Sequence, residues 1–316
     1  MRNYYLLFFL LLIFQSTVNA QNGKIIEQIP YTIADTSMAQ IEKRLPNAKA
    51  LINAVDFFKI TYLSDGLKVN GFMSVPKKSG KFPCIIFNRG GNRDYGGTTD
   101  FTLDRFFAEM SSWDYVVVGS HYRGNKGSEG KEEFGGSDVN DVINLIPFFS
   151  HVEKADTSRI GMYGWSRGGM MTYRALTMTN QIKAAVVGSG MAEAFIQTKK
   201  RPEMDSVFSE LALGYFINRD SVLKTRSAVY WAEKISPSTP LLLLTGSADW
   251  RVSPEEQLTM LNKLYEIKHP VRFQFFEGGQ HSLIEYVDEV NHVSRNFLDA
   301  YVRDGKTFPS LEPHGK

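Results

Sequence analysis

The 316-residue sequence contains one cysteine, Cys84, so no internal disulfide can form and stability must come from packing. Charge of neither sign predominates, because 36 Lys and Arg residues stand against 34 Asp and Glu residues, a formal net charge of +2. Without a basic block or stripe, nucleic acid is not expected as the main partner. No His, Cys and Asp cluster has metal-ligand spacing, so the sequence implies no metal and no organic cofactor.

A long hydrophobic run is also missing, because the apolar stretch at residues 4–14 is well short of the roughly 20 residues that span a bilayer. It follows Met1-Arg2-Asn3 and precedes a polar stretch that ends in Val18-Asn19-Ala20, the pattern of a secretory signal peptide. We expect this signal peptide, residues 1–20, to be removed, leaving no stable membrane span and a secreted or periplasmic protein. No cysteine lies near the cleavage point, so the sequence does not support a lipid anchor.

Internal repeats, low-complexity tracts and Pro/Gly/Ser-rich linkers are absent from residues 21–316. A mature chain of about 300 residues is at the upper limit of what one hydrophobic core supports. We therefore predict a single domain over residues 21–316. No feature of the sequence specifies an oligomeric state.

Short apolar runs alternate with amphipathic helical patterns from residue 82 onward. Runs that are apolar on both faces are typical of parallel strands covered by helices on both sides. We therefore predict an α/β fold with a mostly parallel central sheet, whose expected strands are residues 84–87, 115–119, 160–163, 184–187, 241–244 and 271–276. Ahead of them, residues 55–63 and 67–75 flank Ser64-Asp65-Gly66 and predict a β-hairpin.

Helical patterns precede and separate these strands. Residues 36–53 have irregular helical character, and the apolar residues after Ser137 fall on one face of a helix. Residues 253–256, Ser-Pro-Glu-Glu, combine a capping box with Pro at the first helical position. The last helix is predicted from about residue 285 to 302, with Gly305 ending it.

Residues 190–236 interrupt the alternation, because a direct crossover between the flanking strands would be shorter. We predict that this stretch forms a small helical insertion or lid over the site, since long insertions often carry function. The alternative is an ordinary helix with longer loops.

Residues 164–169, Gly-Trp-Ser-Arg-Gly-Gly, lie between a predicted strand and a predicted helix and match the nucleophile elbow. This strained turn lifts the Ser166 hydroxyl clear of the sheet. Glycine is expected at positions 164 and 168, because a side chain there would clash with the neighbouring strand and helix. The backbone N–H of Arg167 is expected to point toward a developing oxyanion. The alternative is a tight packing turn in an inactive relative.

A serine hydroxyl needs a base to take its proton, and His281 is the best placed of the six histidines. It ends a glycine-containing loop, residues 277–281, between the predicted strand 271–276 and the last helix. His121 is the runner-up because it follows the predicted strand 115–119. It precedes the serine, however, whereas the chain order with such an elbow is serine, acid, histidine.

Asp249 follows the predicted strand 241–244, between the elbow and the histidine. We predict that it orients the imidazole of His281 and stabilises the ring once it is charged. The alternative is a cap on the helix that begins near Ser253. Glu277 and Asp288 are weaker candidates, because they bracket the histidine and do not precede it by a strand and a helix.

Four motifs in this order resemble the catalytic domain of the prolyl oligopeptidase family of serine peptidases. They are residues 122–130 leading into Glu133-Phe134, residues 164–170 around Ser166, residues 246–252 around Asp249 and residues 278–281 ending in His281. The resemblance covers roughly residues 60–302 and implies an α/β-hydrolase fold with a serine, acid and histidine triad.

The sequence departs from the family pattern at two points. Members usually carry a β-propeller ahead of the catalytic domain, for which this chain has no room, so we expect substrates to be filtered differently. Many members also place Tyr or His before the glycine pair that helps form the oxyanion hole, whereas Arg89 precedes Gly90-Gly91 here. The second oxyanion donor is then either a backbone N–H near Gly90 or the Arg89 guanidinium. Alternatively, Arg89 forms a structural ion pair in the loop, with Asp94 as a candidate partner.

These residues together predict two-step acyl transfer. Ser166 attacks a carbonyl, His281 shuttles the proton, Asp249 orients His281, and the Arg167 N–H and the Gly90 region stabilise the oxyanion. The resemblance implies a serine-type peptidase acting on short peptides, and the missing propeller leaves open a carboxylesterase of acylated small molecules or sugars. A third alternative is a non-catalytic binding protein on the same fold, against which the complete triad counts.

Overall fold

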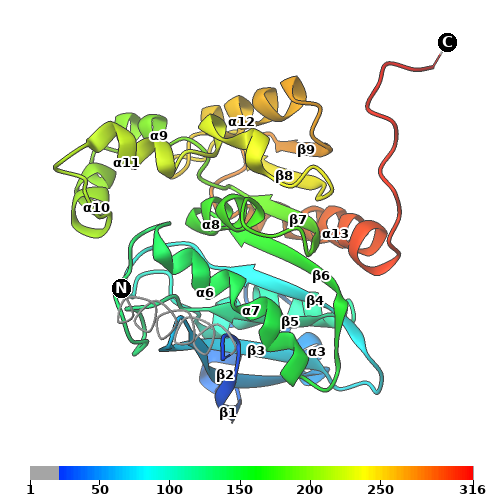
Figure 1. Ribbon diagram of the computed structural model, residues 1–316. Helices are drawn as coiled ribbons and strands as arrows, with labels where there is room; N and C mark the ends of the chain where they lie inside the picture. Colours follow the sequence, from blue (N-terminus) through cyan, green and yellow to red (C-terminus); the bar gives the residue numbers. More distant parts are fainter. Residues whose placement is uncertain (1–20, 316) are drawn as a thin grey trace, which may run out of the picture.

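The computed structural model describes residues 21–315, so the expected signal peptide at residues 1–20 lies outside the described residues. Within them, nine strands form one sheet in the order β1-β2-β3-β5-β4-β6-β7-β8-β9 (Figure 1). The strands are β1 (Ile25–Tyr31), β2 (Val55–Ser64), β3 (Leu67–Pro76), β4 (Phe82–Asn88), β5 (Val116–Ser120), β6 (Ala155–Trp165), β7 (Ile182–Gly188), β8 (Leu241–Gly246) and β9 (Val271–Phe276). Strands β4 to β9 pair in parallel, and β1, β2 and β3 are antiparallel.

The predicted β-hairpin is confirmed as β2 and β3, with Ser64 paired to Leu67 across the turn. Asp65 has φ 52° and Gly66 has φ 81°. Two consecutive positive φ values match the right-handed twist of the flanking strands, which is why an Asp-Gly pair favours this connection. Strand β1 was not predicted; it pairs antiparallel with β2, and most of its residues are exposed.

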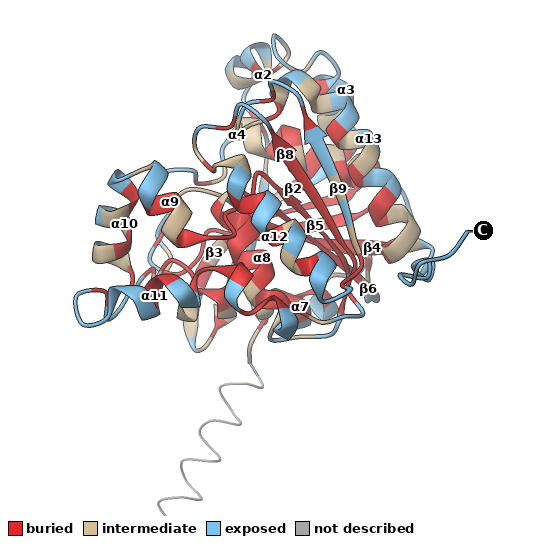
Figure 2. Cartoon of the chain, turned by 90° about the horizontal axis from the view of Figure 1, so that it is seen from above, coloured by how far each residue is buried: buried red, intermediate tan, exposed pale blue. Residues whose placement is uncertain are grey.

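Both faces of the sheet are covered by helices, as predicted. Successive strand residues point to opposite faces, so Cys84 and Ile86 of β4 belong to one hydrophobic core, while Ile85 and Phe87 belong to the other. Figure 2 shows these buried strands between the helical layers. The first core is covered by α6 (Asn140–Ile143), α7 (Leu145–Phe148), α8 (Arg167–Leu176) and α12 (Pro254–Glu266), and the second by α2 (Asp35–Ile41), α3 (Ala48–Asn53), α5 (Glu109–Ser112) and α13 (Val287–Leu298).

Two details of the helices differ from the prediction. The helix after Ser137 is broken into a 3-10 turn, Ser137–Val139, followed by the short helices α6 and α7. Ser253 precedes α12, but its side chain makes no capping hydrogen bond, and the backbone N–H of Glu256 donates to the Ser253 carbonyl at 2.9 Å instead. The Glu256 carboxyl turns away and accepts from the backbone N–H groups of Ala192 and Glu193. The capping box was therefore wrong, whereas Pro at the first helical position was right. No helix within residues 21–315 is long and apolar enough to cross a membrane.

The helical insertion between β7 and β8 is confirmed. It contains α9 (Ala194–Lys200), α10 (Glu203–Leu211) and α11 (Arg219–Thr225), which lie together at one side of the molecule in Figure 1. Whether this insertion acts as a lid stays a prediction.

Candidate active site

Ser166 lies at the turn between strand β6 and helix α8. Its backbone has φ 59° and ψ −124°, a conformation that is strained for a residue with a side chain. The N–H of Ser166 donates to the carbonyl of Gly188 at 2.9 Å, and its carbonyl accepts from Gly169 at 2.9 Å and from Met191 at 3.0 Å. These bonds hold the turn in the shape that a nucleophile elbow requires.

The glycines beside the serine are sterically required. A Cβ atom at Gly164 would overlap the carbonyl oxygen of Gly168 and the hydroxyl of Thr172, and one at Gly168 would overlap the carbonyl oxygen of Asn88. The strand β4 that carries Asn88 and the helix α8 therefore approach each other as closely as their backbones allow. This agrees with the expectation that both positions need glycine.

Asp249 and His281 come together from two loops that follow neighbouring parallel strands, β8 and β9. The imidazole Nδ1 of His281 lies 2.8 Å from Oδ2 of Asp249. The other carboxylate oxygen, Oδ1, accepts from the backbone N–H groups of Arg251 at 2.8 Å and Val252 at 3.0 Å. The carboxylate is thus fixed on one side and free to orient the imidazole on the other. Both N–H groups belong to residues that precede α12, so Asp249 does not cap this helix.

The backbone of His281 is tied to the residue that precedes the serine, because Trp165 Nε1 donates to the His281 carbonyl at 3.0 Å. The runner-up, His121, is buried away from the cavity that Ser166 lines. Burial and the nearby charge of Arg89 lower the pKa of His121 to about 3, so it stays neutral at ordinary pH. The structure therefore brings His281, and not His121, to the side of Ser166.

Arg89 does not place its side chain where an oxyanion forms. Its guanidinium is buried and donates to the backbone carbonyls of four residues, at distances from 2.7 to 3.4 Å; the acceptors are Gly90, Arg93, Tyr95 and His121. These bonds use all five of its N–H groups. Asp94 instead accepts from the backbone N–H of Lys126 at 2.8 Å. Both the guanidinium donor and the ion pair with Asp94 were therefore wrong, because the side chain is consumed in holding the loop.

The remaining donors are the backbone groups near Gly90 and Arg167. A Cβ atom built on Gly90 would lie 3.0 Å from Ser166 Cβ and 3.5 Å from Ser166 Oγ, so this loop passes directly beside the serine. Arg167 is the first residue of α8, where backbone N–H groups have no partner within the helix. The two backbone segments flank Ser166, as the predicted oxyanion hole requires.

Ser166 and His281 line one cavity of about 260 Å³. Residues of the loop 89–96 line it, and the insertion contributes Gln197, Arg201 and Met204 to the lining. A cavity of this size encloses a few residues of peptide or a small ester.

The comparison with known families agrees with this geometry. The model of the Prolyl oligopeptidase family matches residues 102–304, which is more than half of the chain. The chain belongs to the prolyl oligopeptidase family. It is therefore a serine hydrolase homologue with the α/β-hydrolase fold.

Relatives within the family differ in length. The chain is 27% identical over 228 residues to the uncharacterized peptidase YtmA of Bacillus subtilis, covering 72% of this chain and 86% of that protein. It is 27% identical over 219 residues to human dipeptidyl peptidase 8, covering 64% of this chain but only 23% of that protein. It therefore spans less than a quarter of the longer relative.

Solved structures share the fold at lower identity. An acylaminoacyl peptidase of Pyrococcus horikoshii superposes with a TM-score of 0.68 at 22% identity, covering 82% of this chain and 44% of that one. A puromycin-hydrolyzing peptidase of Mycobacterium tuberculosis superposes with a TM-score of 0.65 at 23% identity, covering 75% of this chain and 38% of that one.

The prediction from sequence missed the carboxylates that support the elbow in this family member. The guanidinium of Arg167 is almost fully buried, pairs with Glu132, and pairs with Asp138 at 2.7 Å. Glu132 also accepts from the backbone N–H of Arg93 at 2.6 Å. The residue after the nucleophile is thereby connected to the loop that carries Gly90. The only sequence signal is that Glu132 directly precedes the Glu133-Phe134 pair of the family-like motif.

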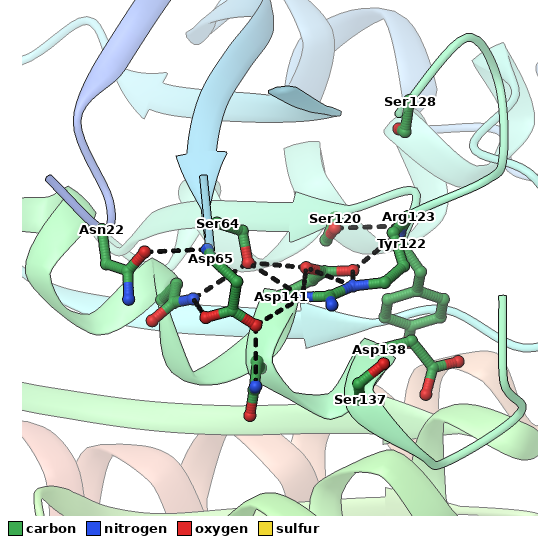
Figure 3. A network of polar contacts seen from close by, with 12 residues as sticks. Asn22, Ser64, Asp65, Ser120, Tyr122, Arg123, Ser128, Ser137, Asp138 and Asp141 are labelled. Carbon is green, nitrogen blue, oxygen red and sulfur yellow. Dashed lines mark hydrogen bonds and ion pairs between the residues drawn. The ribbon is translucent and has the colours of Figure 1, made fainter. Parts of the chain in front are cut away.

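A second buried network holds the Arg-Gly loop that follows β5 (Figure 3). Arg123 pairs with the fully buried Asp141 at 2.7 Å and with Asp65 of the hairpin turn at 2.8 Å. Next to it, Tyr122 donates through its hydroxyl to the carbonyl of Arg89 at 3.1 Å. The ion pairs of Arg123 therefore anchor the segment that supports the loop beside Ser166.

Proposed function

We propose that this chain is a serine-type peptidase that cleaves short peptides through an acyl-enzyme on Ser166. The observation that carries the proposal is the 2.8 Å contact between His281 and Asp249 beside the strained Ser166, with both Ser166 and His281 facing one cavity. Names of relatives such as YtmA, dipeptidyl peptidase 8 and the acylaminoacyl peptidase support peptide substrates.

The reaction begins when Ser166 Oγ attacks the scissile carbonyl while His281 takes the hydroxyl proton. Asp249 stabilises the imidazolium that forms, and the backbone N–H groups of Arg167 and the Gly90 segment bind the oxyanion. When the tetrahedral intermediate collapses, His281 gives the proton to the leaving amine. Water then attacks the acyl-enzyme with His281 as base. His281 returns this proton to Ser166 Oγ as the second tetrahedral intermediate collapses, and the acid product leaves.

Export belongs to the same proposal. The signal-peptide pattern in residues 1–20 supports a secreted or periplasmic protein. Mass spectrometry of the N-terminus, after expression with the full sequence, tests this: a mature chain that begins at Gln21 supports export, and an intact Met1 contradicts it.

The activity is tested with a panel of peptide amides and a series of p-nitrophenyl esters, using the mature protein and the Ser166→Ala variant. We expect amide turnover that Ser166→Ala abolishes, and labelling of Ser166 by a fluorophosphonate. Ser209 does not line the cavity, so Ser209→Ala is the matched control and should keep full activity. Ester turnover with inert amides would identify a carboxylesterase instead, and activity that survives Ser166→Ala would overturn the mechanism.

A further inference from the structure

The charged side chains around the cavity are of one sign. Among the described residues that line it, four are arginine and none is Asp or Glu; the arginines are Arg89, Arg167, Arg201 and Arg251. Two of these cations are already satisfied by the protein. Arg89 gives all its N–H groups to backbone carbonyls, and Arg167 pairs with two buried carboxylates.

Arg251 is in a different situation. Within residues 21–315 its guanidinium pairs with no carboxylate, and its side chain makes one hydrogen bond, to the hydroxyl of Tyr95 at 3.1 Å. Arg251 stands two residues after Asp249, so its cation lies beside the acid and base of the site. A guanidinium has five N–H donors, and most of those on Arg251 are left for a ligand.

Arg201 reaches the same place from the insertion. Its Nη1 donates to the backbone carbonyl of Arg251 at 3.1 Å, and its Nε pairs with Glu203 at 2.9 Å. Glu203 is exposed, and ion pairs with exposed carboxylates contribute little because water competes for them. Both guanidiniums also lie over the ring of Trp250, at 5.3 Å for Arg201 and 4.7 Å for Arg251. One indole ring is thus a neighbour of both cations.

We propose that Arg201 and Arg251 form a carboxylate-binding subsite, so that the protein prefers peptides with an acidic group next to the scissile bond. Planar guanidiniums bind a carboxylate through paired N–H groups, and both arginines line the cavity that Ser166 lines. A substrate with an ammonium group at this position meets only cations. The inference rests on the proposed peptidase function, because it assigns the substrate class of the same site.

Steady-state kinetics test the subsite with matched N-acetylated peptide p-nitroanilides that carry Glu, Gln or Lys at either of the two residues before the scissile bond. At one of these positions we expect kcat/KM to be tenfold or more higher for Glu than for Gln, and lowest for Lys. Arg201→Gln and Arg251→Gln should each reduce the Glu-to-Gln ratio toward one. The ratio cancels any damage that a substitution does to both substrates. Lys200→Gln removes the neighbouring exposed cation, which does not line the cavity, and should leave the ratio unchanged.

A binding measurement separates this inference from the proposed function. Calorimetry with Ser166→Ala and the same peptides requires no turnover, and we expect tighter binding of the Glu peptide that is lost in Arg251→Gln/Ser166→Ala. If peptides are cleaved by Ser166 but Glu and Gln peptides are cleaved and bound equally, the subsite is overturned and the peptidase stands. If no peptide is cleaved but the arginine-dependent preference in binding persists, the peptidase is overturned and the carboxylate subsite stands.

Discussion

Arg167 donates from Nη1 to the backbone carbonyl of Gly91 at 3.0 Å. Arg167, the residue that follows Ser166, therefore supports the site through both its backbone and its side chain. Its backbone N–H belongs to the turn around Ser166, and its side chain fixes the opposite loop. One buried guanidinium thus positions both the serine turn and the loop that carries Gly90. This guanidinium pairs with Glu132 and Asp138.

Glu132→Gln should lower activity and stability together. The substitution keeps the side-chain volume and leaves Arg167 paired with Asp138, but it replaces the charged acceptor of Arg167 by a neutral amide, which should reduce the free energy of unfolding by about 2 kcal/mol. The loop at Arg93 loses its charged acceptor as well, so we expect kcat to fall about tenfold through poorer oxyanion stabilisation. Urea unfolding and steady-state kinetics measure the two effects. The neighbouring Glu133→Gln is the control, and an equal loss of kcat there would contradict the role of Glu132.

Gly90→Ala should affect catalysis more than folding. The added Cβ would lie 3.0 Å from Ser166 Cβ and 3.1 Å from the Trp165 carbonyl oxygen, so the loop must shift by a few tenths of an ångström. A displaced oxyanion donor costs on the order of a hundredfold in kcat. Gly66→Ala is the opposite case, because it has open space but φ 81°; we expect it to cost about 1 kcal/mol in stability and no activity. Full activity of Gly90→Ala would exclude this segment from the oxyanion hole.

The sequence predicts those parts of the fold that depend on local pattern. Continuous apolar runs identify the strands β4, β5, β7 and β8 and the second half of β6, because strands buried on both faces have few polar positions. The edge strand β9 is different, because the exposed Arg272 and Gln274 interrupt its apolar residues. The same reasoning misses β1, whose residues are mostly exposed, so neither alternation nor a continuous apolar run marks it. The Glu256 capping box fails for a related reason: a fully buried carboxyl is drawn to the backbone N–H groups of Ala192 and Glu193, 64 and 63 residues away in sequence.

The candidate triad could be predicted from sequence because chain order and strand ends restrict the candidates to a few residues. The environment of Arg89 is not readable, because the carbonyls that it binds come from Gly90, Arg93, Tyr95 and His121 and meet only in the folded loop. Glu132 and Asp138 were missed for the same reason, since they lie 35 and 29 residues from Arg167. Long-range ion pairs leave no periodic signal in a sequence.

Asp249→Asn should lower kcat while leaving the stability of the fold nearly unchanged. The amide retains an oxygen for the N–H groups of Arg251 and Val252, so the loop should keep its shape, but it no longer stabilises the charged imidazole of His281. We expect kcat to fall on the order of 10⁴-fold, with the midpoint of thermal unfolding nearly unchanged. Asp288→Asn tests the weaker candidate acid and should leave kcat intact. A large loss in Asp288→Asn with little loss in Asp249→Asn would reverse the assignment.

Asp104 should make stability depend on pH. The carboxyl is buried and neither oxygen accepts a hydrogen bond within the described residues. Burial, with the nearby Glu109 carboxyl, raises its pKa from the ordinary 3.8 to about 7. Since the folded state binds the proton more tightly than the unfolded chain, this residue makes the protein less stable as pH rises from about 4 to about 7.

The expected loss from Asp104 is roughly 4 kcal/mol above pH 7, at 1.36 kcal/mol for each unit of pKa. Asp104→Asn removes the titration, so its stability relative to wild type should improve steadily from pH 4 to pH 8. Urea unfolding at pH 4, 6 and 8 measures the difference. Asp114→Asn serves as the control for the same chemical change at a carboxylate that pairs with Lys78 at 2.8 Å. Parallel pH profiles for wild type and Asp104→Asn would mean that Asp104 ionises freely in the folded protein, despite its burial.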